Sequence, residues 1–145
     1  MRMSSELRTG RHVVFELHAH IVFVPKYRKR IFDRDALERL HQVFARVCGD
    51  FETTLVEFNG EPDHVHLLVN YPPKVALSAL VNSLKGVSAR RLRQERPDVA
   101  KKYWKGGFWS ASYFVASVGG APLMVLRRYI ESQLAPQEAG ASSPP

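Results

Sequence analysis

The sequence predicts an α+β fold of the ferredoxin-like type, an antiparallel sheet with two helices packed on one face, followed by a C-terminal helix. Three observations support this prediction. Residues 13–24 alternate between apolar and polar side chains, two later segments repeat apolar residues at helical spacing, and strand-like segments lie between and after the helices. In chain order the elements are β-α-β-β-α-β, which is the pattern of that fold.

The first predicted strand and helix lie in the N-terminal third of the chain. The alternation of residues 13–24 is typical of a long strand with one buried face, and Pro25 ends it. Asp33 can cap the helix that follows, in which apolar residues recur at helical spacing until Gly49. We therefore expect one strand over residues 13–24 and one helix between Asp33 and Gly49.

A hairpin and a second helix are predicted in the middle of the chain. Residues 51–58 are rich in β-forming residues, and the Asn-Gly pair at residues 59–60 has the composition of a tight hairpin turn. The partner strand is expected at residues 63–70, and the two prolines at residues 72–73 separate it from a helix. The apolar stripe of this helix comprises Leu77, Leu80, Val81, Leu84 and Val87.

The C-terminal part of the chain is predicted to contain a loop, a strand and a last helix. Residues 101–109 are basic and aromatic, as in a loop, and residues 112–118 have the composition of a short fourth strand. Pro122 can occupy the first turn of the last helix, which is expected to reach about residue 134.

Length and composition indicate a single domain. A chain of 145 residues, 45% of them hydrophobic, suits one compact core. We expect residues 1–10 to form a flexible arm, residues 11–135 to form the domain, and residues 136–145, rich in Pro, Gly, Ala and Ser, to form a disordered tail. No apolar run approaches the roughly 20 residues of a membrane span. The single cysteine, Cys48, excludes an intramolecular disulfide and suits a cytoplasmic protein.

The charge distribution favours a polyphosphate partner. The chain carries 21 Lys and Arg residues against 14 Asp and Glu residues, a net charge of +7 with neutral histidines. Residues 74–105 contain nine basic and two acidic side chains, and this difference of seven equals the excess of the whole chain. Clustered positive charge is the footprint of nucleic-acid binding. On charge alone, a solvated face that only keeps the protein in solution stays open.

Two His-x-His pairs are candidate ligand sites. His18 with His20, and His64 with His66, lie two residues apart in predicted strands. Residues i and i+2 of a strand point to the same side, so either pair can present two imidazoles to one metal ion. Spacing alone also allows both pairs merely to occupy the open face of the sheet.

Tyr129 and Gln133 form a further candidate pair. They lie four residues apart in the last predicted helix, so the phenol hydroxyl and the amide oxygen share one helix face and can address the same ion or phosphate. A tyrosine is also common at the rim of an amphipathic helix, so the spacing alone leaves a purely structural role open.

Four segments together resemble the HUH-type single-tyrosine transposases of bacterial insertion sequences, the IS200-like transposase family. The resemblance covers roughly residues 11–133, and the order and spacing of the four segments are far more specific than any one of them. The segments are Pro-Lys-Tyr-Arg at residues 25–28, Pro-Asp-His-Val-His-Leu-Leu at 62–68, Ser-Leu-Lys-Gly-Val-Ser at 83–88 and Tyr-Ile-Glu-Ser-Gln at 129–133.

The resemblance implies a metal-dependent DNA strand transferase with a single catalytic domain. Tyr129 would be the nucleophile, and His64 and His66 would bind a divalent metal with Gln133 as the third ligand. Two imidazoles and an amide do not dictate one ion, but Mg²⁺ or Mn²⁺ suits a reaction at a phosphate.

The resemblance also implies the substrate and the assembly. Members of the family cleave single-stranded DNA at ends that carry hairpins. They keep the strand as a 5′-phosphotyrosine, so that a 3′ hydroxyl from another end can rejoin it. The family forms homodimers by sheet pairing, and the tyrosine helix of one subunit can serve the histidines of the other. His18 and His20 are left as DNA contacts or sheet-face residues.

We expect basic and aromatic side chains to hold the DNA. Arginines near the end of the second helix would follow the backbone and make binding sensitive to salt. Aromatic residues of the loop at residues 101–109 would stack on bases, although Phe108 and Trp109 can equally well close the core beneath the loop. The predicted contacts are Lys26, Arg28, Lys85, Arg90, Arg91, Arg93 and Trp104.

Three other functions are weighed against this one. A domesticated relative would act on chromosomal palindromes with the same residues. A metal-independent two-histidine phosphoesterase normally has Ser or Thr two residues after each His, where this chain has His20 and His66. An RNA-recognition module would carry an aromatic strand motif that the sequence lacks.

Overall fold

The computed structural model describes residues 7–103, 107–117 and 129–133. Within these ranges, none of the helices has the length and apolar character needed to span a membrane. The strands are β1 (Arg8–Thr9), β2 (Val14–Phe15), β3 (His18–Phe23), β4 (Thr54–Glu61), β5 (His64–Asn70) and β6 (Phe114–Ser117). The helices are α1 (Arg34–Asp50), α2 (Leu77–Glu95) and α3 (Pro97–Ala100), with short 3-10 segments η2 (Lys26–Arg28) and η3 (Lys101–Tyr103).

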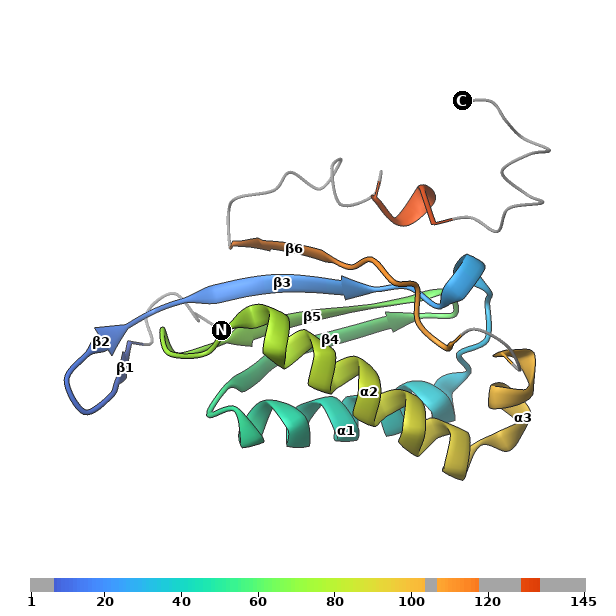
Figure 1. Cartoon of the computed structure of the whole chain (residues 1–145), viewed down its shortest axis with the longest axis horizontal. Coiled ribbons are helices and arrows are strands. Elements are labelled where there is room, and N and C mark those ends of the chain that lie inside the picture. Colours follow the sequence, from blue (N-terminus) through green and yellow to red (C-terminus); the bar gives the residue numbers. More distant parts are fainter. Residues whose placement is uncertain (1–6, 104–106, 118–128, 134–145) are drawn as a thin grey trace.

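A four-stranded antiparallel sheet in the order β4-β5-β3-β6 forms the centre of the fold. Helices α1 and α2 lie together on one side of it (Figure 1). This arrangement confirms the predicted ferredoxin-like fold. Of the predicted C-terminal helix, residues 129–131 are helical and residues 132–133 form a turn, whereas its other residues lie outside the described ranges. The predicted tail, residues 136–145, also lies outside them.

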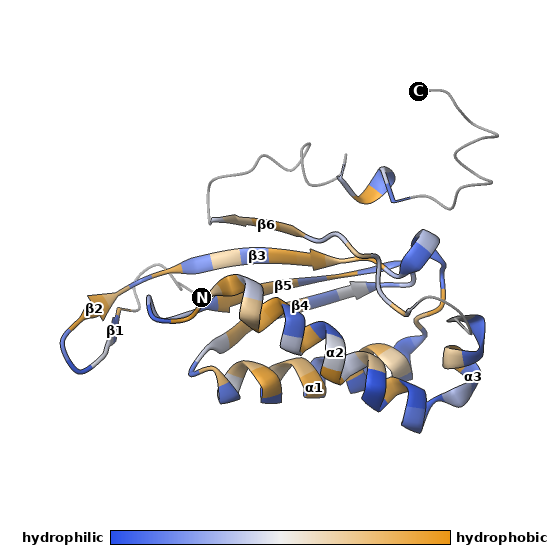
Figure 2. Ribbon diagram, viewed as in Figure 1, coloured by the Kyte–Doolittle hydropathy of each residue, from blue (hydrophilic) through white to orange (hydrophobic). Residues whose placement is uncertain are grey.

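The core fills the space between the sheet and the two helices. Ile21 and Phe23 of β3 and the alternate residues of β5 are fully buried, and the central strands are largely apolar in Figure 2. Phe108 and Trp109 are only 5% and 7% exposed. The Trp109 ring packs on Phe23 at a centroid distance of 5.6 Å. These two aromatic residues therefore close the core and are not available to stack on bases.

The predicted strand at residues 13–24 is divided into β2 and β3. The ladder between β3 and β5 ends with the pair His18 and Asn70, because β5 runs into prolines that cannot continue it. Upstream of His18, β2 pairs with β1 instead. Arg8, in the arm predicted to be flexible, lies in β1 and donates to Asn70 Oδ1 at 2.7 Å.

The prediction of a hairpin turn at residues 59–60 is wrong. Both residues lie in β4, and the two-residue turn is at residues 62–63. Gly60 serves helix packing instead, because a Cβ built there would meet the Leu37 side chain of α1 at less than van der Waals distance. The sheet edge can approach α1 this closely only because Gly60 has no side chain.

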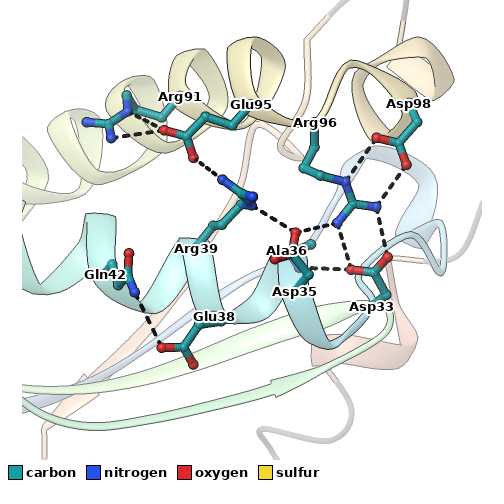
Figure 3. Close-up of polar contacts among 10 residues, drawn as sticks. All are labelled: Asp33, Asp35, Ala36, Glu38, Arg39, Gln42, Arg91, Glu95, Arg96 and Asp98. Carbon is teal, nitrogen blue, oxygen red and sulfur yellow. Dashed lines mark hydrogen bonds and ion pairs between the residues drawn. The ribbon is translucent and has the colours of Figure 1, made fainter.

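A cluster of charged side chains joins the helix ends (Figure 3). Asp33 caps α1, accepting from the Ala36 amide at 2.8 Å, as predicted. Arg96, which follows α2, forms ion pairs with Asp33, Asp35 and Asp98, each at 2.8 Å. The hydrogen bonds from Arg96 lower the pKa of Asp33 below its ordinary range and that of Asp98 to about 2. This guanidinium therefore connects α1, α2 and α3.

Replacing Gly60 tests its close contact with α1. Gly60→Ala is expected to lower the free energy of unfolding by about 1 kcal/mol, because the Leu37 side chain must move to admit the new methyl group. Gly86→Ala is the matched control, since no atom lies within 4 Å of its added Cβ and Ala is favoured within a helix. Denaturant titration measures the free energy of unfolding of both variants. A Gly60→Ala variant as stable as Gly86→Ala would contradict the packing argument.

The charged cluster also makes a prediction about acid stability. The pKa values of Asp33, Asp35 and Asp98 are lowered in the folded state. Their contribution to stability is therefore present above the unfolded pKa, and it is lost as the pH falls from about 4 towards 2. Arg96→Gln is expected to make this fall in unfolding free energy shallower, as measured by denaturant titration across that pH range.

The control for this measurement is Arg46→Gln. Arg46 is an exposed residue of α1 that has no polar partner in the described part of the chain. The Arg46→Gln variant should therefore keep the wild-type dependence of unfolding free energy on pH. Identical profiles for all three proteins would show that Arg96 does not lower the carboxyl pKa values.

Candidate active site

The strand β5 presents His64 and His66 on one face of the sheet. Both side chains are half-buried, and Val65 between them is fully buried. Val65 points towards the helices, so the two histidines point to the opposite face, which α1 and α2 leave uncovered. The prediction that this pair shares one side of a strand is confirmed.

Asp63 orients the first histidine. Its Oδ1 accepts a hydrogen bond from His64 Nδ1 at 2.9 Å, and its side chain is only 9% exposed. A proton held on Nδ1 leaves Nε2 of His64 as the lone-pair nitrogen, which is the form that binds a metal ion. No role was predicted for Asp63, although its position immediately before the His-x-His segment is a sequence signal for this one.

His20 on the neighbouring strand β3 contacts the second histidine. Its Nδ1 lies 2.8 Å from Nε2 of His66, and the two rings stack with centroids 4.9 Å apart. Burial, and then the charge of a protonated His20, lower the pKa of His66, so that His66 is neutral at neutral pH. Metal binding through Nε2 of His66 would replace this hydrogen bond.

The donor set fits a divalent ion only in part. In the described ranges, no group of three or more His, Cys, Asp or Glu side chains is arranged to hold a metal ion. His64 and His66 supply two imidazoles on one face, so the remaining positions must be filled by an amide, by water or by phosphate oxygens. Such a set, with open positions, suits an ion that acts on a phosphate.

The structure brings Tyr129 and Gln133 together at residues 110–112. The Tyr129 hydroxyl lies 3.0 Å from Ser112 Oγ. Gln133 Oε1 accepts from Ser110 Oγ at 2.8 Å and lies 3.4 Å from Ser112 Oγ. Burial raises the pKa of the Tyr129 phenol above its ordinary value, and the hydrogen bond with Ser112 partly offsets this effect. No sequence pattern pointed to these two serines.

The tyrosine and the histidine pair lie at different places on the sheet. The Tyr129 ring packs on Phe114 of β6 at a centroid distance of 5.6 Å. Phe114 pairs with Val22, and Val22 pairs with His66, so these three residues form one row across β6, β3 and β5. Two strand spacings separate Phe114 from His66 by about 10 Å. Among the described residues, no contact joins Tyr129 or Gln133 to His64 or His66.

Helix α2 holds the loop that carries the two serines. Lys85 Nζ donates to the carbonyl of Ser110 at 2.7 Å and to that of Ala111 at 3.2 Å. Ser88, one turn later, accepts from the indole nitrogen of Trp109 at 3.0 Å. Burial lowers the pKa of the Lys85 ammonium. The Ser-Leu-Lys-Gly-Val-Ser segment at residues 83–88 therefore fixes this loop.

The predicted DNA contacts have different environments. Arg28 is paired with Asp63 at 3.0 Å, and Arg91 with Glu95 at 2.9 Å. Arg90 and Arg93 are exposed and have no polar partner in the described part of the chain. They lie at the hydrophilic C-terminal end of α2 (Figure 2), on the helix-covered side of the sheet.

Lys26 and Trp104 are two further predicted DNA contacts. Lys26 Nζ lies over the Tyr27 ring, 5.8 Å from its centroid. Trp104 lies outside the described residues.

Comparison with known proteins gives consistent results. A protein family described as "Transposase IS200 like" matches residues 13–133. The ISDra2 transposase TnpA of Deinococcus radiodurans is 31% identical over 128 residues, which are 88% of this chain and 91% of the relative. The transposase for insertion sequence element IS200 of Salmonella typhimurium is 30% identical over 129 residues, 89% of this chain and 84% of the relative.

Two solved structures have a similar fold. A crystal structure of a candidate transposase from Deinococcus radiodurans R1 superposes with a TM-score of 0.81 and 30% identity, covering 88% of this chain and 98% of that one. A REP-associated tyrosine transposase bound to a REP hairpin superposes with a TM-score of 0.50 and 10% identity, covering 86% of this chain and 68% of that one. The second likeness shows the fold alone.

The hydrogen bond between Ser112 and Tyr129 makes a prediction about the phenol. Ser112→Ala is expected to raise the pKa of Tyr129 further, because the serine hydroxyl stabilises the phenolate while burial opposes it. The measurement is the phenolate absorbance titration of each protein minus that of its Tyr129→Phe counterpart. Ser110→Ala is the control, since Ser110 bonds to Gln133 and, at 3.5 Å, to Ser112, but not to the phenol. Equal pKa values for Tyr129 in the Ser112→Ala variant and the wild type would contradict this account.

Proposed function

The chain belongs to the IS200-like transposase family, and from this premise we propose that it cleaves and rejoins single-stranded DNA at hairpin-bearing ends through a covalent tyrosyl intermediate. Membership of the family implies DNA strand cleavage and transfer. The observation that carries the finer proposal is the paired presentation of His64 and His66 on the uncovered face of the sheet, with Asp63 holding His64 in the tautomer that binds metal.

In this proposal, His64 and His66 hold Mg²⁺ or Mn²⁺ with Gln133 as the third ligand. The ion would polarise a non-bridging phosphate oxygen and offset the charge that develops in the transition state. Asp63 keeps the proton on Nδ1 of His64, and the lowered pKa keeps His66 neutral. A metal ion binds an imidazole through such an unprotonated ring nitrogen.

Tyr129 is the proposed nucleophile. Its hydroxyl oxygen attacks the phosphorus, the bond from phosphorus to the 3′ oxygen breaks, and the strand stays on the protein as a 5′-phosphotyrosine. The phenol proton is transferred to solvent, and the departing 3′ oxygen takes up a proton. The new phosphodiester conserves the energy of the old one, so a 3′ hydroxyl from another end can reverse the step. Burial keeps the phenol protonated at neutral pH, so it needs activation in the complex with DNA.

The separation of the two halves of the site supports a shared active site. Tyr129 packs at the β6 edge of the sheet, and the histidine pair lies on β5. The nucleophile must therefore move across β3, or Tyr129 of the partner subunit must supply it. We propose a homodimer in which the tyrosine segment serves one subunit's histidines or the other's.

The substrate is proposed to be a folded single strand. A small metal site on a sheet face admits a phosphate most readily when no paired strand covers it. Arg90 and Arg93 are exposed and have no polar partner among the described residues, and they offer positive charge to parts of the DNA backbone away from the histidine pair, since α2 lies on the other side of the sheet. The REP-associated transposase that shares the fold is described as bound to a REP hairpin. Action on dispersed chromosomal palindromes would use the same chemistry.

The decisive experiment looks for the covalent adduct. Labelled hairpin DNA incubated with the protein and Mg²⁺ is expected to produce a shifted protein band on a denaturing gel. Tyr129→Phe should bind the DNA yet form no adduct, because the attacking oxygen is missing. Tyr113→Phe is the matched control and should form the adduct. An undiminished adduct with Tyr129→Phe would assign the nucleophile to another residue.

Removing the metal is a second arm of the same experiment. A chelator is expected to abolish cleavage while sparing most of the DNA binding, because basic side chains supply the binding. Cleavage that persists in the chelator would remove the role proposed for His64 and His66.

A further inference from the structure

The turn after β3 has an unusual backbone. Tyr27 and Arg28 have φ angles of 64° and 51°, in the left-handed region that residues with a Cβ rarely adopt. The turn is held by a hydrogen bond of 2.7 Å from the Arg28 amide to the Pro25 carbonyl. A β-bridge also joins Pro25 to Trp109. Strain that the surrounding structure maintains is frequent at functional sites.

The strained turn directs the Arg28 side chain between two parts of the proposed active site. Arg28 Nε lies 3.0 Å from Asp63 Oδ2, and Arg28 Nη1 donates to the Ile130 carbonyl at 3.3 Å. The other oxygen of Asp63 accepts from His64. A continuous set of contacts thus runs from the segment that carries Tyr129, through Arg28 and Asp63, to the histidine pair.

We propose that Arg28 is a positioning residue for the transposase reaction. It ties residues 129–133 to the turn that precedes the subunit's own histidine strand, and it fixes Asp63, whose other oxygen holds the His64 ring. The inference rests on the proposed function of Tyr129 and His64. The planar guanidinium reaches two acceptors at once, which a lysine ammonium at this position cannot reproduce with the same geometry.

The alternative role, a contact to a DNA phosphate, fits Arg28 less well. Its side chain is 23% exposed and already paired with the nearly buried Asp63. Arg30 in the same turn has a side chain that is 69% exposed and lies 4.0 Å from Asp63. Arg30 therefore offers a matched control, with the same charge and nearly the same position but without the contact to Ile130.

The experiment uses the full chain with hairpin DNA and compares Arg28→Gln with Arg30→Gln. At saturating DNA, Arg28→Gln is expected to slow single-turnover adduct formation by about tenfold, whereas Arg30→Gln should keep the wild-type rate. The DNA dissociation constant of Arg28→Gln and its salt dependence should match the wild type. Arg28→Lys, which keeps the charge, should give an intermediate rate of adduct formation. It replaces Arg28→Gln as the test variant if Arg28→Gln does not fold.

A second readout needs neither metal nor DNA. The amides of Ser132 and Gln133 donate to the carbonyls of Tyr129 and Ile130 at 3.1 Å. Hydrogen exchange of a peptide covering residues 129–133 should be faster in Arg28→Gln than in the wild type or Arg30→Gln, because the segment loses its anchor.

The outcomes separate the inference from the proposed function. An unchanged adduct rate with unchanged exchange would overturn the role of Arg28. Weaker DNA binding with a salt slope reduced by about one, at an intact saturated rate, would make Arg28 a phosphate contact instead. If the wild-type protein forms no adduct, the proposed function fails, and unchanged exchange in Arg28→Gln would then overturn the structural link as well.

Discussion

Burial on one face of β5 is the constraint on which the site depends. Val65, Leu67 and Val69 are fully buried against the helices, so the residues between them must point to the other face. A register slip of one residue would turn the histidines towards the helices and the valines to the other face. The hydrophobic effect on the helix side therefore keeps His64 and His66 side by side on the uncovered side.

Contacts within the protein use much of the positive charge that composition alone would assign to DNA. Lys85 binds two loop carbonyls, Arg96 joins three helix ends, and Arg28 is paired with Asp63. The bonds of Lys85 and Arg28 place the loop and the turn that contact the Tyr129 segment, and those of Arg96 hold the helix ends together. The basic residues of the chain thus serve two different purposes, and only exposure and pairing in the folded protein distinguish them.

The sequence predicted the elements whose signals are local. The cap of α1 at Asp33 and the apolar face of β5 depend on residues near one another in the chain, and both are confirmed. The hairpin turn was placed wrongly because Asn-Gly has the composition of a turn, whereas Gly60 is required by the side chain of Leu37 on α1. The strand at residues 13–24 was predicted too long because its length depends on where β5 ends.

The sequence by itself determined the order of the elements, the side of the strand on which the histidine pair lies, and the family to which the chain is similar. The first two follow from period and spacing over a few residues, whereas the resemblance to the family rests on four segments spread over residues 25–133. Only the tertiary structure decided that His20 meets His66, 46 residues away, and that Arg28 reaches Ile130, 102 residues away. Such contacts depend on strand register and on the left-handed backbone of one turn, and no local pattern of residues encodes either.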